Sequence, residues 1–405
     1  MNTMRIAWRN LWRNSRRTGI TIVAMSLSTA VLIITYALML GMMVQMEHSV
    51  TDVTVGQVQV HHRNYLKERS LYDTVDGWEN ILETARRDGI AAAPRAFGFG
   101  LLSSGNKSAG VQFWGVDPAS EQQIGDMAKN LLKGTYLSGR PSMGVVLGRK
   151  LARTLHADVG TELVAVVQAS DGSLGNELFH VRGILKSVGE NLDRSVAIID
   201  REDFASLFVL PDQYHEIALN SRGQLSPDEV AAKIRSSAGS NEVRTWRQIL
   251  PGVSDMLNTS SGATMIFLVI FFLAAGLGVL NTLLMATYER IPEFGLLKAI
   301  GTSSWRILRD VSAEALVLGI LSSILGGIIG TIVSLYFQYF PIDLSAFGEG
   351  FNTSGVVISA QWGALLTLRG IIWPIVIMWL VSVLAALYPA AKAARLDPVR
   401  ALTHV

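Results

Sequence analysis

The sequence has no cysteine, and this single absence excludes three kinds of chemistry. With no cysteine among 405 residues, the chain forms no disulfide framework, no cysteine-liganded zinc site and no thiol nucleophile. The absence does not identify a compartment, because a domain of about 200 residues can bury enough apolar surface to fold without disulfides.

Motifs that carry enzyme chemistry are also missing. The chain contains no GxSxG, no HExxH and no Walker motif, and the GNKS segment at 105–108 lacks the GK pair of a phosphate loop. The pair His61-His62 is expected to be surface histidine at a strand end rather than a metal site. We therefore expect a protein that is not an enzyme and that binds no metal or cofactor itself.

Charge is absent from four long stretches of a chain that is 49% hydrophobic and only 17% charged. Each stretch exceeds the roughly 20 residues that cross a bilayer, which favours membrane spans over buried helices of a soluble core. None contains an ionisable residue, which weighs against a proton- or sodium-coupled carrier. The uncharged windows are Thr18–Met46, Met256–Tyr288, Ala315–Ile342 and Gly370–Ala391.

The distribution of lysine and arginine beside the spans predicts their orientation. These residues gather before the first span, between the second and third, and in the tail, whereas the loop after the third span holds only Arg369. The positive-inside rule then places both termini in the cytoplasm and residues 47–255 outside. The predicted layout is an amphipathic interfacial helix at 1–17, transmembrane helices at 18–46, 256–288, 307–342 and 370–391, an extracytoplasmic domain at 47–255, a cytoplasmic coupling helix at 289–306, a short extracytoplasmic loop at 343–369 and a cytoplasmic tail at 392–405.

The residues before the first span have the pattern of an interfacial helix. Trp8 and Trp12 fall on an apolar face, and Arg5, Arg9 and Arg13 fall opposite. Indole rings suit the headgroup boundary and arginines suit anionic lipid, so these five residues are predicted to anchor the chain at the inner leaflet. An ordinary cytoplasmic extension is the alternative.

Small residues and span length make two further predictions about the helices. Gly326 and Gly330 form a GxxxG step that allows close helix packing, either within the chain or across a dimer. The 33 residues of the second window form a helix of about 50 Å, longer than the bilayer core of about 30 Å. The first two spans are therefore expected to extend beyond the membrane as a rigid stalk.

The segment at 47–255 is predicted to be an α+β domain. It has 22 basic and 26 acidic side chains, a net charge of −4, and the rest of the chain carries +6, which argues against nucleic-acid binding. Ser226 is predicted to cap one of its helices. The strand-like runs are Val55–Val60, Val111–Val116, Leu163–Val167, Phe179–Ile184 and Val196–Ile199, and the helical patterns are Trp78–Arg87, Arg149–Leu155 and Pro227–Ser236.

The sharpest local pattern is ERIPEFGLLKAIG at 289–301, directly after the second span. It predicts a short helix across the membrane face, with Glu289 and Glu293 on one side and an apolar ridge of Phe294, Leu297 and Ile300. Gly301 would end this helix. Such a helix can fit a groove on a cytoplasmic partner, whereas a solvated connector would not need so regular a ridge.

This segment resembles the coupling helix of the FtsX-like ABC transporter permeases, the type VII or mechanotransmission group that includes the MacB-type and lipoprotein-releasing LolC/LolE-type proteins. Pro292 departs from the usual pattern but is tolerated in the first turn of a helix. The tail Tyr388–Leu402 is similar to the C-terminal signature of the same families. The layout and the outer runs Gly56–Val60 and Val181–Leu185 are closest to those of the lipoprotein-releasing permeases.

The resemblance implies an α-helical membrane protein with four transmembrane helices and a large extracytoplasmic α+β domain, in two subdomains, between helices 1 and 2. It also implies a separate cytoplasmic ABC ATPase that binds ATP and Mg²⁺, with Phe294 and Leu297 entering a groove on it and Glu289 and Glu293 facing basic or polar groups. The residues assigned to this contact are Glu289, Arg290, Glu293, Phe294, Leu297, Lys298 and Gly301.

The remaining partners follow from the same resemblance. They are a second permease subunit, identical or paralogous, the lipid bilayer of a bacterial inner membrane, and an extracytoplasmic carrier or adaptor protein. The implied cargo is a lipoprotein or another amphiphile. The alternative function is an FtsX-like signalling or scaffold permease that activates a cell-wall hydrolase or a sensor without net transport.

Overall fold

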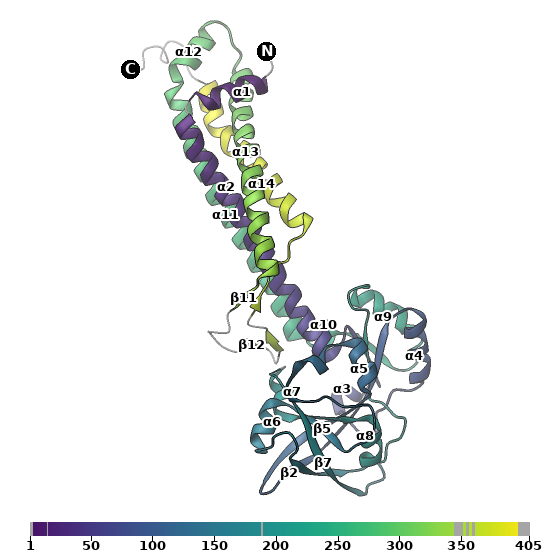
Figure 1. Cartoon of the computed structure of the whole chain (residues 1–405). Helices are drawn as coiled ribbons and strands as arrows, with labels where there is room; N and C mark the ends of the chain where they lie inside the picture. The colour runs from purple at the N-terminus through teal and green to yellow at the C-terminus, as the bar shows by residue number, and fades with distance from the viewer. Residues whose placement is uncertain are drawn as a thin grey trace. The chain divides into compact units, whose positions relative to one another are not determined.

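The computed structural model describes residues 3–13, 15–187, 189–343, 351–353, 356–358 and 361–395. It divides into two compact units, which are described separately (Figure 1). The helical unit comprises residues 1–44, 258–344 and 361–405, and the α/β unit comprises residues 45–257 and 345–360. The predicted tail after residue 395 and much of the predicted loop at 343–369 lie outside the described residues.

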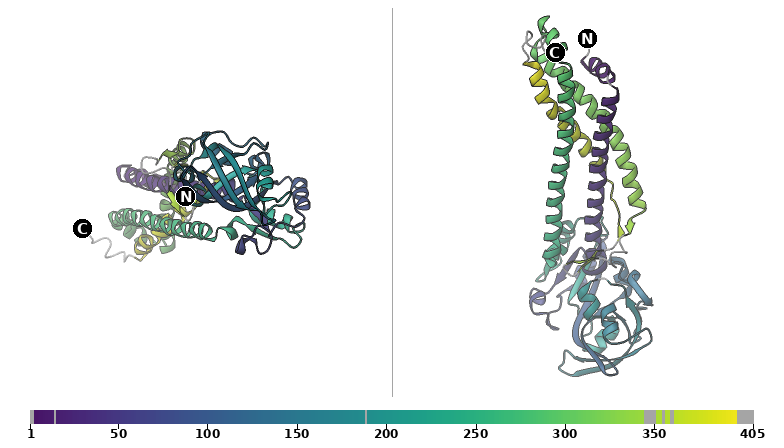
Figure 2. Two further views of the ribbon diagram at one scale, coloured as in Figure 1. Left: turned by 90° about the horizontal axis from the view of Figure 1, so that it is seen from below. Right: turned by 90° about the vertical axis from the view of Figure 1, so that its left-hand side faces the viewer.

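Four helices in the described part of the chain are long and apolar enough to cross a membrane, and they run lengthwise beside one another (Figures 1 and 2). Each begins or ends within a few residues of its predicted bounds, because capping and turn residues rather than hydropathy set the ends of a helix. Ser303, for example, occupies the N-cap position of the third. The four are α2 (Ser15–Val50), α11 (Pro251–Glu289), α13 (Ser304–Tyr339) and α14 (Leu368–Ala394).

Helix α13 approaches α2 closely at two glycines. A Cβ atom on Gly326 would lie 2.3 Å from the backbone oxygen of Ser26, and one on Gly330 would lie 3.0 Å from the Ile33 side chain. The Ser26 hydroxyl donates a hydrogen bond to the Ser322 carbonyl at 2.9 Å. The structure therefore places the GxxxG step at a contact within the chain.

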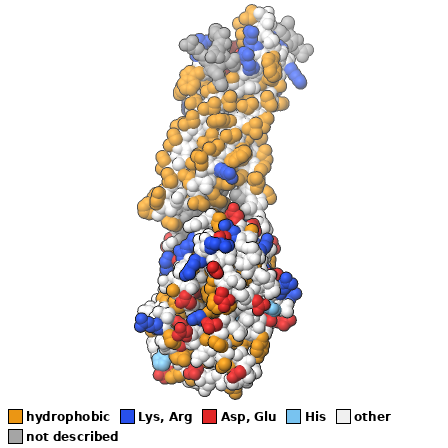
Figure 3. Space-filling view, turned by 90° about the vertical axis from the view of Figure 1, so that its right-hand side faces the viewer, with side chains coloured by type: hydrophobic (Ala, Val, Ile, Leu, Met, Phe, Trp, Pro, Cys, Tyr) orange, Lys and Arg blue, Asp and Glu red, His pale blue; other side chains and the backbone are white. Residues whose placement is uncertain are grey.

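The surface of α11 is mostly uncovered within the chain. Only 11% of its most apolar window is buried, against 39% in α13. Figure 3 shows hydrophobic side chains over much of another face of the helical unit, with a few basic side chains among them. An apolar helix face of this extent requires lipid or another protein surface around it.

The shorter elements of the helical unit lie at the ends of these helices. Helix α1 (Thr3–Trp12) precedes α2, and α12 (Ile291–Ala299) joins α11 to α13. Strands β11 (Ile342–Asp343) and β14 (Gln361–Trp362) pair antiparallel. A second antiparallel pair, β12 (Phe351–Thr353) with β13 (Val356–Ile358), is assigned to the α/β unit.

The α/β unit is built on one ten-stranded sheet in the order β10-β1-β9-β2-β3-β8-β5-β7-β4. Strand β6 pairs with both β2 and β7, so β2, β3, β8, β5, β7 and β6 close into a six-stranded barrel. The strands are β1 (Val58–His61), β2 (Ala91–Ser104), β3 (Lys107–Val116), β4 (Leu131–Gly134), β5 (Gly144–Leu147), β6 (Glu162–Gln168), β7 (Leu174–Leu185), β8 (Val196–Asp200), β9 (Glu216–Asn220) and β10 (Glu242–Thr245).

Two lobes share the long strand β2. The barrel lobe has its own core, which includes Phe113 and Phe179. In the other lobe, α4 (Trp78–Arg87) and α9 (Pro227–Arg235) supply Ile81 and Val230 to the core of a layer formed by β10, β1, β9 and the start of β2. Strands β3 to β8 lie between β2 and β9 in the chain, so the barrel lobe is inserted between two parts of the other lobe, and the unit has the two subdomains that the resemblance implied.

The predicted fold class is confirmed, and local signals account for several elements of the α/β unit. The Ser226 hydroxyl accepts from the Glu229 N–H, and the Glu229 carboxylate accepts from the Ser226 N–H, which closes a capping box at the start of α9. The remaining helices are the π-helical turn η1 (Thr51–Val55), α3 (Tyr65–Glu68), α5 (Pro118–Ile124), the 3₁₀ helix η2 (Met127–Asn130), α6 (Arg149–Thr154), α7 (Glu190–Ser195), α8 (Arg201–Phe208) and α10 (Trp246–Ile249).

The expectation for His61 was wrong. Its side chain is 1% exposed, because the β1 face that carries it is covered within the lobe rather than open to solvent. The ring nitrogens lie 2.8 Å from the Gln59 side-chain oxygen and 3.1 Å from the His215 carbonyl. No group of three potential metal-ligating side chains occurs among the described residues.

Candidate coupling surface and helix-to-domain junction

Helix α12 ends in a glycine-dependent turn. The Gly301 N–H donates to the Lys298 carbonyl at 3.0 Å and the Thr302 N–H donates to the Leu297 carbonyl at 2.9 Å, which is the Schellman arrangement. Gly301 has φ +93°, a conformation that side-chain-bearing residues rarely adopt. The turn fixes the direction in which the chain leaves α12 for α13.

The structure contradicts the predicted role of Phe294. Its ring is 4% exposed and packs against Ile307 and Val311 of α13 and Ala390 of α14. The helical period places residue 294 on the face that the neighbouring helices cover, so it cannot enter a groove on another protein. Phe294 instead holds α12 against the ends of α13 and α14.

Three predicted coupling residues make contacts within the chain. Arg290 donates to the buried Glu314 carboxylate at 2.8 Å, and Lys298 donates to the Ala394 carbonyl at 2.7 Å. Glu293 accepts from Arg13 at 2.7 Å and from Arg290 at 3.3 Å. Partial burial raises the pKa of Glu293, but the hydrogen bonds from Arg13 and Arg290 outweigh it and hold this pKa below its usual range. These contacts position α12, and the predicted partner contacts of the three stay predictions.

The outward apolar residues of this region flank the Schellman turn. Leu297 is 40% exposed and Ile300 is 73% exposed. Leu296 and Trp305 are also exposed, and the sequence analysis singled out neither of them. A tryptophan in the first turn of α13, two residues after the Ser303 cap, was the signal that could have found one of them. We call Leu296, Leu297, Ile300 and Trp305 the coupling surface. Glu289 is also exposed.

Helix α1 has two different faces. Ala7 and Leu11 are buried against the helical unit, whereas Trp8 and Trp12 are about half exposed and meet edge to face with ring centroids 5.9 Å apart. Arg9 is exposed. The side chain of Arg5 lies outside the described residues. Arg13 follows α1 and forms an ion pair with Glu293 of α12, which the sequence analysis missed. This ion pair links α1 to α12.

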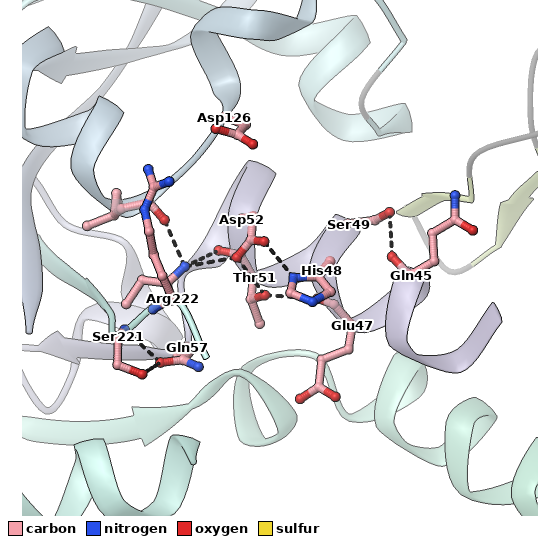
Figure 4. Close-up of polar contacts among 12 residues, drawn as sticks. Gln45, Glu47, His48, Ser49, Thr51, Asp52, Gln57, Asp126, Ser221 and Arg222 are labelled. Atoms are coloured by element: carbon pink, nitrogen blue, oxygen red, sulfur yellow. Dashed lines mark hydrogen bonds and ion pairs between the residues drawn. The ribbon is translucent and has the colours of Figure 1, made fainter. Parts of the chain in front are cut away.

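A second site lies within the α/β unit, which begins at residue 45 and therefore includes the last turns of α2 and η1 (Figure 4). The last turn of α2 carries His48, whose ring lies 2.6 Å from the Asp52 carboxylate. The buried Asn220 side chain of β9 donates to Asp52 at 3.0 Å and to the Ile124 carbonyl of α5 at 2.7 Å. The Asp126 N–H donates to the Asp52 carbonyl at 2.7 Å.

Close backbone approach reinforces this junction. A Cβ on Gly125 would lie 2.1 Å from the Asp52 carbonyl oxygen, so only glycine fits there. The Gln57 side-chain oxygen accepts from both the N–H and the hydroxyl of Ser221 at 2.8 Å (Figure 4). Because π-helical turns are uncommon and often occur at functional sites, we interpret the junction as the point that fastens the end of α2 to β9 and α5.

A buried ion cluster connects the two lobes of the α/β unit. Arg95 of β2 donates two hydrogen bonds to Glu121 of α5, at 2.7 and 2.9 Å, and one to Glu216 of β9 at 2.8 Å. Burial raises the pKa of Glu216 to about 7, despite the Arg95 guanidinium. Burial also lowers the pKa of the neighbouring His61 to about 4.

These two shifts predict an altered pH dependence in a Glu216→Gln variant. Glu216 binds a proton more readily when folded, so its contribution to stability falls as pH rises from 4.5 to about 7. His61 binds a proton less readily when folded, so its contribution rises between pH 4 and 6.5. In the variant the falling contribution of Glu216 is absent, and only the rising contribution of His61 to stability remains. Its unfolding midpoint, followed by tryptophan fluorescence, should climb more steeply than wild type between pH 4.5 and 6.5, and equal slopes would contradict the assignment.

Comparison with known families matches most of the chain. Residues 18–237 match the MacB-like periplasmic core domain, and residues 265–398 match the FtsX-like permease C-terminal domain. The first match covers more than half of the 405 residues.

Individual relatives are distant. The chain is 23% identical over 349 residues to the lipoprotein-releasing system transmembrane protein LolC of Neisseria meningitidis serogroup B, which covers 82% of this chain and 83% of that protein. It is 24% identical to the pyoverdine export ATP-binding/permease protein PvdT of Pseudomonas syringae pv. tomato, over 100% of this chain but only 59% of that protein. The solved periplasmic region of MacB from Actinobacillus actinomycetemcomitans aligns with 47% of this chain and 89% of that structure, at 13% identity and a TM-score of 0.36.

Proposed function

Because this chain belongs to the FtsX-like permeases with a MacB-like periplasmic core domain, and is an ABC transporter permease of that type, we propose that it converts ATP hydrolysis by a separate subunit into movement of its α/β domain. The ATPase docks on the coupling surface beside Gly301. The observation that carries the proposal is an exposed apolar surface on a short helix that internal contacts hold rigidly in place.

The pairing with an ATPase has support from two sides. The relatives PvdT and MacB are named as combined ATP-binding/permease proteins, and this chain matches part of each. In this chain, Arg290, Lys298 and Phe294 tie α12 to α13 and α14, so force applied to α12 is passed to two membrane helices. ATP and Mg²⁺ bind to the partner in this scheme, and the chain itself performs no catalysis.

The membrane arrangement follows from the charge distribution. Both termini and α12 lie in the cytoplasm, and the α/β domain lies outside the inner membrane. The uncovered apolar face of α11 is the surface we assign to a second permease subunit, identical or paralogous. The junction at Asp52 and Asn220 then transmits movement of α2 to β9 and α5, in step with an extracytoplasmic carrier or adaptor.

The cargo is a lipoprotein or another amphiphile. The name of the relative LolC refers to lipoprotein release, and that of PvdT to pyoverdine export. The rival function is a signalling permease that moves its outer domain to activate a hydrolase or sensor without transporting anything.

Purification from native membranes in a mild detergent tests the proposal. An ATP-hydrolysing subunit is expected to co-purify in a fixed ratio to the chain, together with lipid or lipoprotein, identified by mass spectrometry. Recovery of the chain without any ATPase, in repeated preparations, would overturn the proposal. Co-purification of an ATPase with a cell-wall hydrolase but no lipidated cargo would overturn the transport part and favour the signalling permease.

A further inference from the structure

A cleft of about 850 Å³ opens on one face of the sheet in the α/β unit. The strand registers place Arg95 opposite Glu216 and Phe97 opposite Trp114, so these side chains share that face. Its lining combines apolar and aromatic walls with polar and charged side chains such as Gln59, Arg95 and Glu216, and such a mixture suits an amphiphilic molecule. The apolar and aromatic walls are formed by Phe97, Phe99, Trp114, Val196, Ile249 and Leu250.

The charged groups in the depth of the cleft are already paired. Arg95 is held by Glu121 and Glu216, and His61 lies 3.7 Å from Glu216. The charge at the rim is different, because Arg69 is exposed and has no carboxylate partner among the described residues. The rim is therefore a cationic edge on an apolar cleft.

A second pocket, of about 510 Å³, adjoins the first at Arg244, which lines both. It is lined by four cationic side chains, Arg63, Lys67, Arg235 and Arg244, but by the single carboxylate of Glu242. That carboxylate is paired with Arg244 at 2.8 Å. Within the described structure, Arg63, Lys67 and Arg235 have no carboxylate partner.

This concentration of positive charge is unusual for its surroundings. Residues 47–255 carry a net charge of −4, so the basic pocket is a local exception to the sign of the domain. Unpaired arginine and lysine side chains that converge on one pocket are well suited to phosphate or carboxylate oxygens. An apolar cleft that shares one arginine with such a pocket suits a molecule with an anionic head and a hydrocarbon chain.

We propose that the α/β domain binds an anionic lipid, with the head in the basic pocket of Arg63, Lys67, Arg235 and Arg244 and the acyl chain along the cleft. The assignment deepens the proposed function, since it gives the amphiphilic cargo, or the lipid part of one, a site outside the membrane helices. Arg244 sits at the junction of head and chain.

An apolar track extends the cleft along the sheet surface. Phe99 and Leu101 are each 52% exposed on β2. Leu101 pairs with Val166 of β6, and the nearby Val164 pairs with Leu178 of β7, and all three of these side chains are also exposed. An acyl chain that leaves the cleft at Phe99 thus contacts further apolar protein surface rather than water.

The test uses the full chain in nanodiscs of phosphatidylcholine, with a trace of palmitoyl lysophosphatidylglycerol that carries a photoactivatable group in its acyl chain. Cross-linked residues are mapped by mass spectrometry, and cross-links to the exposed α2 residues Ile20, Val23 and Leu27 serve as an internal reference for lipid in the bilayer. Cross-links are expected on β2 and β3 around Phe99 and Gln112. The zwitterionic lysophosphatidylcholine analogue should give far fewer cross-links there.

Variants separate the head from the chain. An Arg63→Gln, Lys67→Gln, Arg235→Gln variant should lower the cleft cross-links at least roughly tenfold, because charge-assisted contacts to the head are lost, while the α2 cross-links stay unchanged. A separate control variant, Lys107→Gln, Arg140→Gln, Arg153→Gln, removes three exposed cations that have no carboxylate partner among the described residues, and it should leave the cleft cross-links unchanged. Phe99→Ser, at an exposed position, should also reduce the cleft cross-links, because it weakens contact with the acyl chain of the lipid.

Three outcomes would overturn the inference. They are an absence of cleft cross-links with either lipid, an equal loss in the triple variant and its control, and full displacement by millimolar inorganic phosphate with no effect of Phe99→Ser. The last outcome would assign the pocket to a soluble anion. Because ATPase co-purification is measured separately, loss of lipid binding with the partner retained would refute this inference and leave the proposed function standing.

Discussion

A Leu297→Asp, Ile300→Asp double variant is expected to lose its ATPase partner while remaining folded. Both side chains are exposed on the coupling surface, so their replacement leaves the core of the protomer intact. Burying a large aliphatic side chain in an interface contributes about 1.5–3 kcal/mol, so loss of two predicts binding at least about a hundredfold weaker. The measurement is the ATP hydrolysis that co-elutes with the tagged chain.

Two further variants make this result specific. Leu132→Asp, Val159→Asp changes two residues that are each 46% exposed in the α/β unit, and it should keep full recruitment. Phe294→Ala should instead lower the free energy of unfolding by about 3–5 kcal/mol, because a buried ring is removed from its packing against α13 and α14. Normal recruitment by the Leu297, Ile300 variant would refute the coupling surface.

The second large effect is expected from Gly326→Leu. The first atom of the new side chain would lie 2.3 Å from the Ser26 backbone oxygen, and a backbone atom in a packed helix cannot move aside cheaply. Overpacking of this kind lowers the free energy of unfolding by about 3 kcal/mol. Most of the protein should therefore be lost from the monodisperse fraction on size exclusion.

Gly19→Leu is the matched control for this prediction. No atom of the described residues lies within 4 Å of a Cβ at Gly19, although it is also a glycine of a membrane helix. The control should keep the wild-type yield and thermal midpoint of the protomer. Equal yields for the two variants would show that α2 and α13 do not meet at Gly326 as the structure has them.

The four membrane helices could be predicted because their causes are local in the sequence. A stretch without charge such as Met256–Tyr288 has to be covered by apolar surroundings wherever it folds, and its backbone satisfies its own hydrogen bonds as a helix. Capping chemistry is equally local, and for that reason Ser226 and Gly301 ended up at the helix ends where the sequence placed them.

The coupling residues mark the limit of such reasoning. Periodicity grouped Phe294 with Leu297 and Ile300 as an apolar ridge, but periodicity does not tell which residues contact the same chain and which contact another protein. The answer depends on where the first turns of α13 and the last turns of α14 lie, and they bury Phe294 while leaving Ile300 exposed. The ion pairs of Arg290 with Glu314 and of Arg13 with Glu293 were hidden for the same reason.

The α/β unit shows the same division on a larger scale. The sequence by itself determined that strands and helices alternate there, that four helices are apolar throughout, and that a short helix follows the second span, because each of these follows from neighbours along the chain. Only the tertiary structure decided that β6 closes a barrel, that His61 is buried, and that Arg63, Arg235 and Arg244 converge on one pocket. Those residues are separated by up to about 180 positions, and strand pairing, which brings them together, is set by the packing of the whole sheet rather than by any local pattern.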